Sequence, residues 1–354
     1  MSRLAAHFRR LVSGQSRGPI AAAERALLRL AEIPYTATVR RRNRYYDDPA
    51  HRQRVPAAVI SVGNLTLGGT GKTPFVAWTV RQLLEHGLRV AIVSRGYKAR
   101  AGAANDEARE LAWQLPDVPH VQNPDRVAAA RAAIQRHGAQ ALVLDDGFQH
   151  RRLARDLDIV LVDALEPFGF DHVFPRGTLR EPPAGFARAQ VIVLSRADLV
   201  EGPRREAIQK RIRAYAPQAA WVEAVHRPRR WLAPGGGEQP LAALEGQRVA
   251  AFCGIGNPPA FAETLKRLGC VLVGLRTFAD HHPYSAADLE SLAAWADAER
   301  ATLVSTVKDL VKIDPAWLAG QPLWGLEIGL TITAGEQLLL ERLAPLVQAS
   351  SRAC

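Results

Sequence analysis

Apolar and polar positions along the chain fall into blocks that predict strands and helices in turn. Short apolar runs rich in β-branched residues predict strands, and apolar residues that recur every three or four positions predict helices. The predicted strands cover residues 57–62, 89–94, 141–144, 158–162, 190–194, 248–253, 271–277, 301–306 and 324–332, and the predicted helices include 73–86, 127–137, 258–268 and 335–347. Alternation of this kind is typical of an α/β protein with a parallel sheet.

The first of these strands and the helix after it enclose a glycine-rich turn. This turn contains, in order, Gly68, Gly69, Thr70, Gly71, Lys72 and Thr73. Glycines allow successive backbone N–H groups to point at phosphate oxygens, Lys72 would reach the β- and γ-phosphates, and the Thr73 hydroxyl would ligate Mg²⁺. Thr66 stands where the usual P-loop spacing has a glycine. The strand–turn–helix context nevertheless favours a phosphate site over an ordinary connection.

The strand at residues 141–144 ends in two carboxylates, Asp145 and Asp146. An apolar strand that ends in an acid is typical of the carboxylate that holds Mg²⁺ opposite a P-loop hydroxyl, so we predict a metal or phosphate role for this pair. Asp106 begins a predicted helix, where capping of the helix is the simplest interpretation. The histidines at positions 281 and 282 follow a strand, and the pattern is equally compatible with a structural and a ligand-facing role.

The tetrapeptide at residues 195–198, Ser-Arg-Ala-Asp, is placed like the base-reading tetrad of GTP-binding switch proteins. Two of the residues before its aspartate differ from that tetrad. The sequence therefore predicts no base-reading role for it.

The net charge of the 354 residues is +11, and most of it lies at the N-terminus. Residues 1–54 hold twelve arginines and four acidic residues, a balance of +8, so we expect an anionic partner there. Apolar stripes at helical spacing in residues 1–12 and 20–30 predict amphipathic helices that lie either on a lipid surface or on the protein's own core. A transit peptide fits less well, because the basic run continues to the first strand.

The three cysteines lack metal-site spacing, which favours a reducing, cytoplasmic compartment without a disulfide framework or a zinc site. The sequence has no apolar run near the roughly 20 residues that a membrane-spanning helix needs. Prolines, arginines and glycines at residues 227–230 and 234–237 predict a linker between two domains.

An ordered set of motifs, from about Arg29 to the end of the chain, resembles the tetraacyldisaccharide 4′-kinase family, the lipid A 4′-kinases. The motifs are GNLTLGGTGKTP (63–74), SRGYK (94–98), NDEA (105–108), DRVAAA (125–130), DDGFQHRRLARDLDIV (145–160), FPRGTLREP (174–182), CGIGNPPAF (253–261), FADHHPY (278–284) and STVKDLVK (305–312). The resemblance implies transfer of the ATP γ-phosphate to the 4′-hydroxyl of tetraacyldisaccharide 1-phosphate, which forms lipid IVA at the cytoplasmic face of the inner membrane.

The same resemblance implies two α/β/α Rossmann-like domains joined by a short linker, the N-terminal one with a P-loop NTPase fold. On this basis we predict membrane-docking helices in residues 1–55, a P-loop kinase domain in 56–225, and a smaller α/β domain in 226–354 that completes the active-site cleft. The N-terminal helices would then dock on the anionic surface of the inner membrane.

Roles for individual residues also follow from the resemblance. Lys72 and Asp146 would take part in catalysis, with Asp106 as the general base and His281, rather than His282, as its partner. ATP would be held by the glycine-rich turn, and Mg²⁺ by Thr73, Asp145 and Asp146. The positions expected to touch phosphates or the sugar are Arg126, Gln149, His150, Arg180 and Glu181.

Two other classes of protein share single features with the chain. A ParA/MinD-like P-loop switch ATPase, acting on a membrane or on DNA, carries a lysine before the paired glycines, where this chain has Leu67. A nucleic-acid-binding protein would explain the basic charge, but charge confined to one amphipathic terminus fits lipid better. We therefore expect a kinase with a lipid disaccharide as its partner and no nucleic acid.

Overall fold

A computed structural model describes residues 3–96, 106–234, 236–279, 282–318 and 320–351. The chain divides into two compact units. The larger unit comprises residues 2–98, 115–226 and 330–354, and the smaller unit comprises residues 99–114 and 227–329. Each is described by itself below.

The larger unit is built on a parallel sheet with the strand order β7-β6-β5-β1-β4-β2-β3. Its strands are β1 (Ala58–Asn64), β2 (Val90–Ser94), β3 (His120–Gln122), β4 (Ala141–Asp145), β5 (Leu157–Asp163), β6 (Val191–Ser195) and β7 (Ala220–Leu232). The central strands are buried along almost their whole length, which is why they appear in the sequence as continuous apolar runs. The predicted α/β class and its parallel sheet are confirmed.

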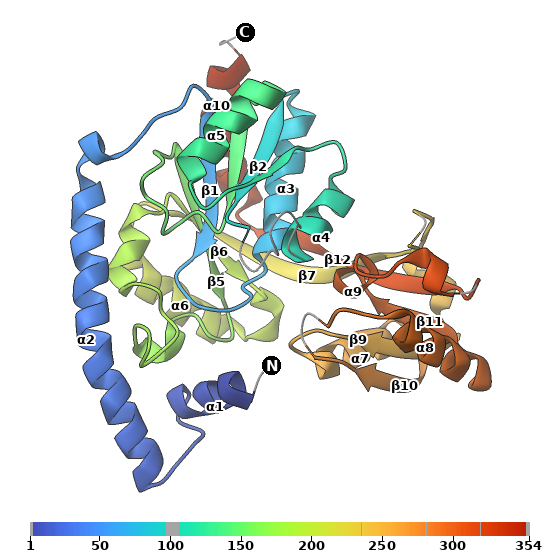
Figure 1. The fold of residues 1–354 in the computed structure, drawn as a ribbon. Coiled ribbons are helices and arrows are strands. Elements are labelled where there is room, and N and C mark those ends of the chain that lie inside the picture. Colours follow the sequence, from blue (N-terminus) through green and yellow to red (C-terminus); the bar gives the residue numbers. More distant parts are fainter. Residues whose placement is uncertain (1–2, 97–105, 235, 280–281, 319, 352–354) are drawn as a thin grey trace. The chain divides into compact units, whose positions relative to one another are not determined.

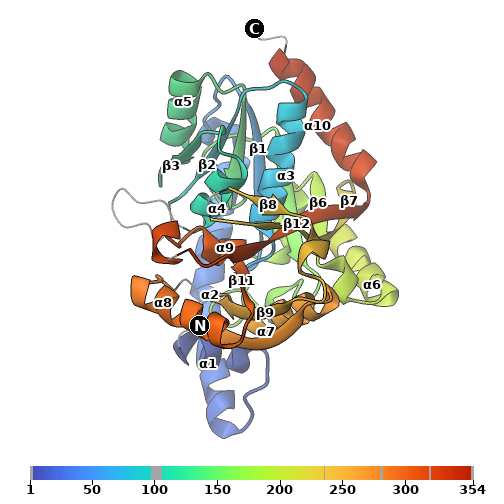
Figure 2. The same cartoon turned by 90° about the vertical axis from the view of Figure 1, so that its right-hand side faces the viewer.

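Helices cover both faces of this sheet. The helices of this unit are α1 (Arg3–Val12), α2 (Pro19–Asp47), α3 (Lys72–Glu85), α5 (Arg126–His137), α6 (Gly202–Arg213) and α10 (Glu336–Ser351). Right-handed crossovers place α3 and α5 on opposite faces, as Figure 2 shows. Asp125 begins α5 by accepting hydrogen bonds from two backbone N–H groups of its first turn, and Gly138 ends it at a φ of 59°.

The smaller unit carries parallel strands in the order β10-β9-β11-β12. Its strands are β8 (Glu238–Gln239), β9 (Arg248–Cys253), β10 (Val271–Thr277), β11 (Thr302–Thr306) and β12 (Leu323–Ala334), and its helices are α4 (Asp106–Gln114), α7 (Pro258–Arg267), α8 (Ala286–Ala298) and α9 (Val307–Leu310). Apolar clusters lie on both faces of the sheet. Ser285 and Asp288 form a reciprocal capping box at the start of α8.

Short 3₁₀-helices also occur in the described chain. They are η1 (Pro49–His51), η2 (Gly169–Asp171), η3 (Pro183–Arg188), η4 (Ala197–Leu199), η5 (Leu241–Leu244) and η6 (Pro315–Leu318).

The predicted linker at residues 227–230 and 234–237 is wrong in its first part. Strand β7 continues through residues 227–230 to Leu232, so this stretch is regular structure. The side chains in the second half of β7 alternate in burial, and Trp231 is fully buried and donates its indole N–H to the carbonyl of Leu241 at 3.2 Å. Arg227 and Arg229 are exposed and Pro228 and Arg230 are half-buried, and these residue types hid the strand in the sequence.

The division into units also differs from the predicted domains. Residues 99–114, which include α4, belong to the smaller unit, where α4 packs against α9. Residues 330–354 belong to the larger unit, where α10 packs against β1. The chain therefore crosses between the units at four points rather than one, and two of these crossings lie inside β7 and β12.

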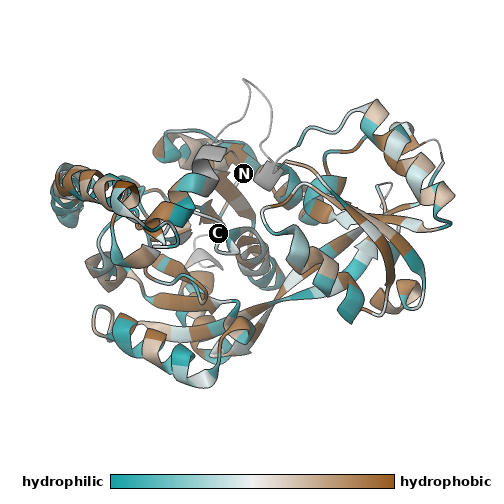
Figure 3. Cartoon of the chain, turned by 90° about the horizontal axis from the view of Figure 1, so that it is seen from below, coloured by the Kyte–Doolittle hydropathy of each residue, from teal (hydrophilic) through white to brown (hydrophobic). Residues whose placement is uncertain are grey.

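The N-terminal helices α1 and α2 belong to the larger unit, and their two apolar stripes differ in exposure. Leu11 and Val12 of α1 are buried, so this end of the first stripe packs on the protein's own core. The stripe on α2 is open to solvent, and the exposed fractions are 77% for Ile20, 67% for Leu27 and 65% for Leu30. In Figure 1 α2 is the long helix coloured blue, and Figure 3 shows hydrophobic and hydrophilic residues along it.

Candidate functional site

The loop between β1 and α3, residues 65–71, is called the glycine loop here. Gly68 and Gly71 have φ angles of +117° and +81°, which residues with side chains rarely adopt. The loop is held by backbone hydrogen bonds to a neighbouring segment, from Leu67 N to Thr178 O at 2.7 Å and from Arg180 N to Leu65 O at 2.6 Å. The glycine loop therefore has a defined path, and α3 begins directly after it at Lys72.

Two cations converge on the carboxylate of Asp146. Arg180 Nη1 donates to both carboxylate oxygens at 2.8 and 2.7 Å, and Lys72 Nζ lies 3.5 Å from Oδ1. Burial raises the pKa of Asp146, but the charges of Lys72 and Arg180 outweigh burial and hold this pKa below its ordinary value. Asp146 has a φ of 55°, and it follows the last residue of β4. The site thus holds an ionised carboxylate between two cations at the end of the central sheet.

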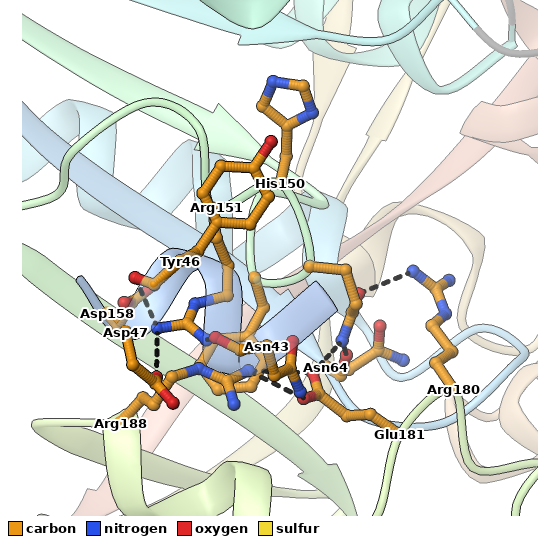
Figure 4. A network of polar contacts seen from close by, with 12 residues as sticks. Asn43, Tyr46, Asp47, Asn64, His150, Arg151, Asp158, Arg180, Glu181 and Arg188 are labelled. Carbon is orange, nitrogen blue, oxygen red and sulfur yellow. Dashed lines mark hydrogen bonds and ion pairs between the residues drawn. The ribbon is translucent and has the colours of Figure 1, made fainter. Parts of the chain in front are cut away.

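Glu181 is fully buried and is linked to the Asp146 ion pairs through Gln149. Its two oxygens accept hydrogen bonds from Arg188 Nη2, both at 2.9 Å, from Asn43 Nδ2 at 2.9 Å and from Gln149 Nε2 at 3.0 Å. Figure 4 shows the side chains of Arg188 and Asn43 pointing toward the Glu181 carboxylate. Gln149 also accepts from Arg180 Nη1 at 3.3 Å, so the buried network reaches the Asp146 ion pairs.

The C-terminal end of α2 is fixed to the same network. Arg151, which is 4% exposed, donates to the carbonyls of Asn43 and Tyr46 at 2.6 and 3.1 Å and pairs with the carboxylate of Asp47 at 2.8 Å. A guanidinium suits the unpaired carbonyls at the end of a helix. Arg151 therefore joins the C-terminal end of α2 to the loop that follows β4, as Figure 4 shows.

Arg126 and His150 add buried donors that have no partner within the described part of the chain. Arg126 is 4% exposed, and its Nε makes no hydrogen bond there; the same is true of His150 Nε2, Thr70 Oγ1 and Arg180 Nε. Burial, with the nearby charge of Arg126, lowers the pKa of His150 to about 4, so its imidazole is neutral at neutral pH. Unpaired buried polar groups are costly, and their clustering indicates a place for a polar ligand.

Thr73 and Asp145 come from adjacent segments of the larger unit. Val62 of β1 lies opposite Asp145 in the parallel pairing of β1 with β4, so the two strands end side by side. Thr73 lies in the first turn of α3, directly after the glycine loop. Asp145 is 6% exposed. A hydroxyl and one or two carboxylates are ligands that Mg²⁺ uses together with water and phosphate oxygens, so these donors fit that ion. A cluster of three or more His, Cys, Asp or Glu side chains suited to a metal was not found among the described residues.

Asp106 and His281 belong to the part of the chain that forms the smaller unit. Asp106 is the first residue of α4, so the predicted helix start is confirmed. His281 lies outside the described residues. His282 is described, and its Nε2 lies 3.2 Å from Asp288 Oδ2 in the first turn of α8. The structure thus brings together Lys72, Asp146, Gln149, Arg180 and Glu181, and Asp106 belongs to the other unit.

Several residues of the site were not predicted from the sequence. Asn64, which is fully buried, accepts from Lys72 Nζ at 3.2 Å and donates to the Thr66 carbonyl at 2.8 Å. The position of Asn64 at the end of β1 could have indicated a site residue, because a buried amide at a strand end needs polar partners. Asn43 and Arg188 had no such signal, since they take part only through contacts with Glu181.

The parallel sheet, the glycine loop with Lys72 directly after it, and the neighbouring carboxylates are typical of an α/β enzyme that transfers phosphate. The chain belongs to the tetraacyldisaccharide-1-P 4′-kinase family, whose sequence model matches residues 24–347.

Curated relatives named tetraacyldisaccharide 4′-kinase are similar over most of the chain. The protein of Anaeromyxobacter dehalogenans (strain 2CP-C) is 43% identical over 323 residues, 85% of each chain. That of Syntrophus aciditrophicus is 36% identical over 344 residues, 89% of this chain and 92% of its own. A solved structure, the apo form of LpxK from Aquifex aeolicus in complex with ATP, superposes with a TM-score of 0.75 at 28% identity, covering 91% of this chain and 99% of that one. The comparisons do not favour the switch ATPase.

Proposed function

We propose that this protein transfers the γ-phosphate of ATP to the 4′-hydroxyl of tetraacyldisaccharide 1-phosphate. The proposal is supported chiefly by the charged groups and buried donors that surround Asp146 in the larger unit. Lys72 and Arg180 flank Asp146 beside buried donors without partners, in a chain that belongs to the 4′-kinase family. Phosphoryl transfer depends mainly on positioning and on neutralising the charge that spreads over the phosphate oxygens, which such donors supply.

In this proposal the larger unit is a P-loop NTPase domain, and the smaller unit is a second α/β/α domain. ATP occupies the glycine loop, with its phosphates against Lys72. Arg126, Gln149, His150, Arg180 and Glu181 serve the phosphates or the sugar, directly or by holding their neighbours. A solved relative that binds ATP supports the choice of nucleotide.

Mg²⁺ is the metal that we propose for this site. Thr73 would hold it, together with the carboxylates of Asp145 and Asp146. When bound, the ion neutralises charge on the nucleotide phosphates. Contacts with Arg180 and Lys72 hold the Asp146 carboxylate in place at this site.

Asp106 is the proposed general base. A sugar hydroxyl is a weak nucleophile, so a carboxylate within hydrogen-bond reach takes its proton as the bond to phosphorus forms. His281 is the proposed partner that orients this carboxylate. Both residues come from the smaller unit's part of the chain, and nucleotide contacts come from the larger unit.

Replacement of Asp106 by asparagine tests the proposed reaction. We expect Asp106→Asn to lower kcat by roughly 10²- to 10⁴-fold, the range of general-base catalysis, while binding of ATP stays unchanged. The assay follows label from γ-labelled ATP into tetraacyldisaccharide 1-phosphate in mixed micelles with Mg²⁺. Asp117→Asn, an exposed aspartate in a loop of the larger unit, is the matched control. Transfer by Asp106→Asn at the rate of this control would rule out the base.

We further propose that α2 docks on the anionic, cytoplasmic face of the inner membrane. No described helix is long and apolar enough to cross a bilayer. The first half of α2 exposes Ile20, Leu27, Leu30 and Ile33, and its second half exposes Arg40, Arg41, Arg42 and Arg44. An apolar surface continued by basic residues suits insertion between anionic headgroups, and the acylated substrate resides in the same layer.

Removal of the exposed leucines tests the docking. The double variant Leu27→Ser, Leu30→Ser should bind vesicles containing anionic lipid at least about tenfold more weakly, because it removes apolar area that the lipid would bury. Sedimentation with vesicles measures the affinity. Leu199→Ser, Leu338→Ser is the control, since these leucines are 53% and 47% exposed outside α2. Equal vesicle binding by the two double variants would show that α2 is not the docking surface.

A further inference from the structure

Arg196, the second residue of the tetrapeptide Ser-Arg-Ala-Asp, lies next to the glycine loop. Its guanidinium pairs with the carboxylate of Asp163, the last residue of β5, and its Nη2 donates to the carbonyl oxygen of Gly69 at 3.0 Å. Arg196 has a φ of 56° and a ψ of 36° directly after β6. This left-handed backbone is unfavourable for a residue with a side chain, so the local fold enforces the direction in which Arg196 leaves the sheet.

The contact with Gly69 fixes the direction of one peptide group. In a trans peptide the C=O of one residue and the N–H of the next point in opposite directions. Because Arg196 holds the Gly69 carbonyl, the N–H of Thr70 is directed away from Arg196. A loop that binds phosphate through backbone N–H groups works only when its carbonyls are turned aside, since a carbonyl oxygen repels a phosphate oxygen.

The next glycine of the loop is supported by His226, a residue of β7. A Cβ built on Gly71 would lie 2.4 Å from both Cε1 and Nε2 of the His226 ring, so the ring packs directly on the Gly71 backbone. Burial, followed by the charge of Arg196, lowers the pKa of His226 to about 4 and keeps the ring neutral. Thr70 lies between these two supported glycines, and its hydroxyl is buried without a partner in the described chain.

We propose that Arg196, oriented by Asp163, is a positioning residue that sets the Gly69–Thr70 peptide for binding the phosphates of the nucleotide, with the His226 ring supporting Gly71. This inference rests on the proposed use of ATP at the glycine loop. Arg196 acts through the backbone, so its role differs from base reading and from direct neutralisation of phosphate charge.

Replacement of Arg196 by glutamine tests the proposal. Binding of ATP alone to the full-length protein is measured by titration calorimetry, and KM for ATP and for the lipid is measured separately. We expect Arg196→Gln to raise Kd and KM for ATP about tenfold, with KM for the lipid unchanged, because a hydrogen bond from a charged donor is lost. Arg196→Lys should recover part of the affinity, since lysine reaches only one of the two acceptors at a time.

Arg204→Gln is the matched control. Arg204 Nη2 donates to the carbonyl of Leu165 at 3.2 Å, which is the same kind of contact outside the glycine loop. Its Kd for ATP should stay within about twofold of the unsubstituted protein. Equal ATP affinities of Arg196→Gln and Arg204→Gln would overturn the proposal.

Asp163→Asn separates positioning from direct contact with the nucleotide. This variant keeps Arg196 but weakens the charge that orients it. Positioning predicts weaker ATP binding by Asp163→Asn, and less than additive loss when it is combined with Arg196→Gln. Unchanged ATP binding by Asp163→Asn would overturn the role of the pair. If the unsubstituted protein failed to bind ATP, the proposed function would fall together with this inference.

Discussion

Substitution of Lys72 by methionine is expected to reduce phosphoryl transfer by roughly 10³-fold, the largest effect on activity of any change proposed for the larger unit. The ammonium group lies 3.5 Å from Asp146 Oδ1 and 3.2 Å from Asn64 Oδ1, and its side chain is only 12% exposed. At this depth a cation is weakly screened, so it stabilises charge on transferring phosphate more than a surface lysine would. Initial rates of label transfer at saturating ATP and lipid measure the loss.

The control for Lys72 is Lys210→Met on α6, which removes an exposed lysine of the same unit. Its transfer rate should match that of the unsubstituted protein. A Lys72→Met rate within tenfold of this control would contradict the place of Lys72 in the proposed site.

Replacement of Glu181 by leucine is expected to have the largest effect on stability. The carboxylate is fully buried and accepts four hydrogen bonds, from Arg188, Asn43 and Gln149. Its loss leaves the largely buried guanidinium of Arg188 without a counter-ion and the amide of Asn43 without an acceptor, which costs about 3–5 kcal/mol of unfolding free energy. Urea denaturation measures this change. Glu201→Leu, which removes an exposed carboxylate just before α6, should change the free energy by less than about 1 kcal/mol.

Transfer activity should fall in Glu181→Leu as well, under conditions in which the variant is folded. Gln149 bonds both Glu181 and Arg180, and Arg180 holds Asp146, so the network passes the change to the ion pairs of the site. A Glu181→Leu protein as stable as the Glu201→Leu control would show that the buried carboxylate does not organise this network.

The strands and the glycine loop could be predicted from sequence because their signals are local. β1 is a continuous apolar run, and the residues after Thr73 repeat at helical spacing, so both the period and the glycines between them are visible without tertiary information. The pair of carboxylates at the end of β4 was visible for the same reason, since the apolar run stops where the charged residues begin.

Other parts of the site depend on contacts between distant segments. Asn43 meets Glu181 across 138 positions of the chain, and Arg196 meets Gly69 across 127. Residues so far apart in the chain form no repeating pattern from which their contact could be predicted. β7 was mistaken in part for a linker because three arginines and one proline occupy residues 227–230, where exposed and half-buried positions alternate. The position of α4 in the smaller unit likewise depends on its packing against α9.

The position at which label enters the lipid tests the proposed phosphorylation of the 4′-hydroxyl most directly. The full-length protein would be incubated with Mg²⁺, γ-labelled ATP and tetraacyldisaccharide 1-phosphate in mixed micelles, and the lipid product would be fragmented in a mass spectrometer. We expect a second phosphate on the 4′-oxygen of the sugar that lacks the 1-phosphate. Hydrolysis of ATP without label in the lipid, or a phosphate at another hydroxyl, would contradict it.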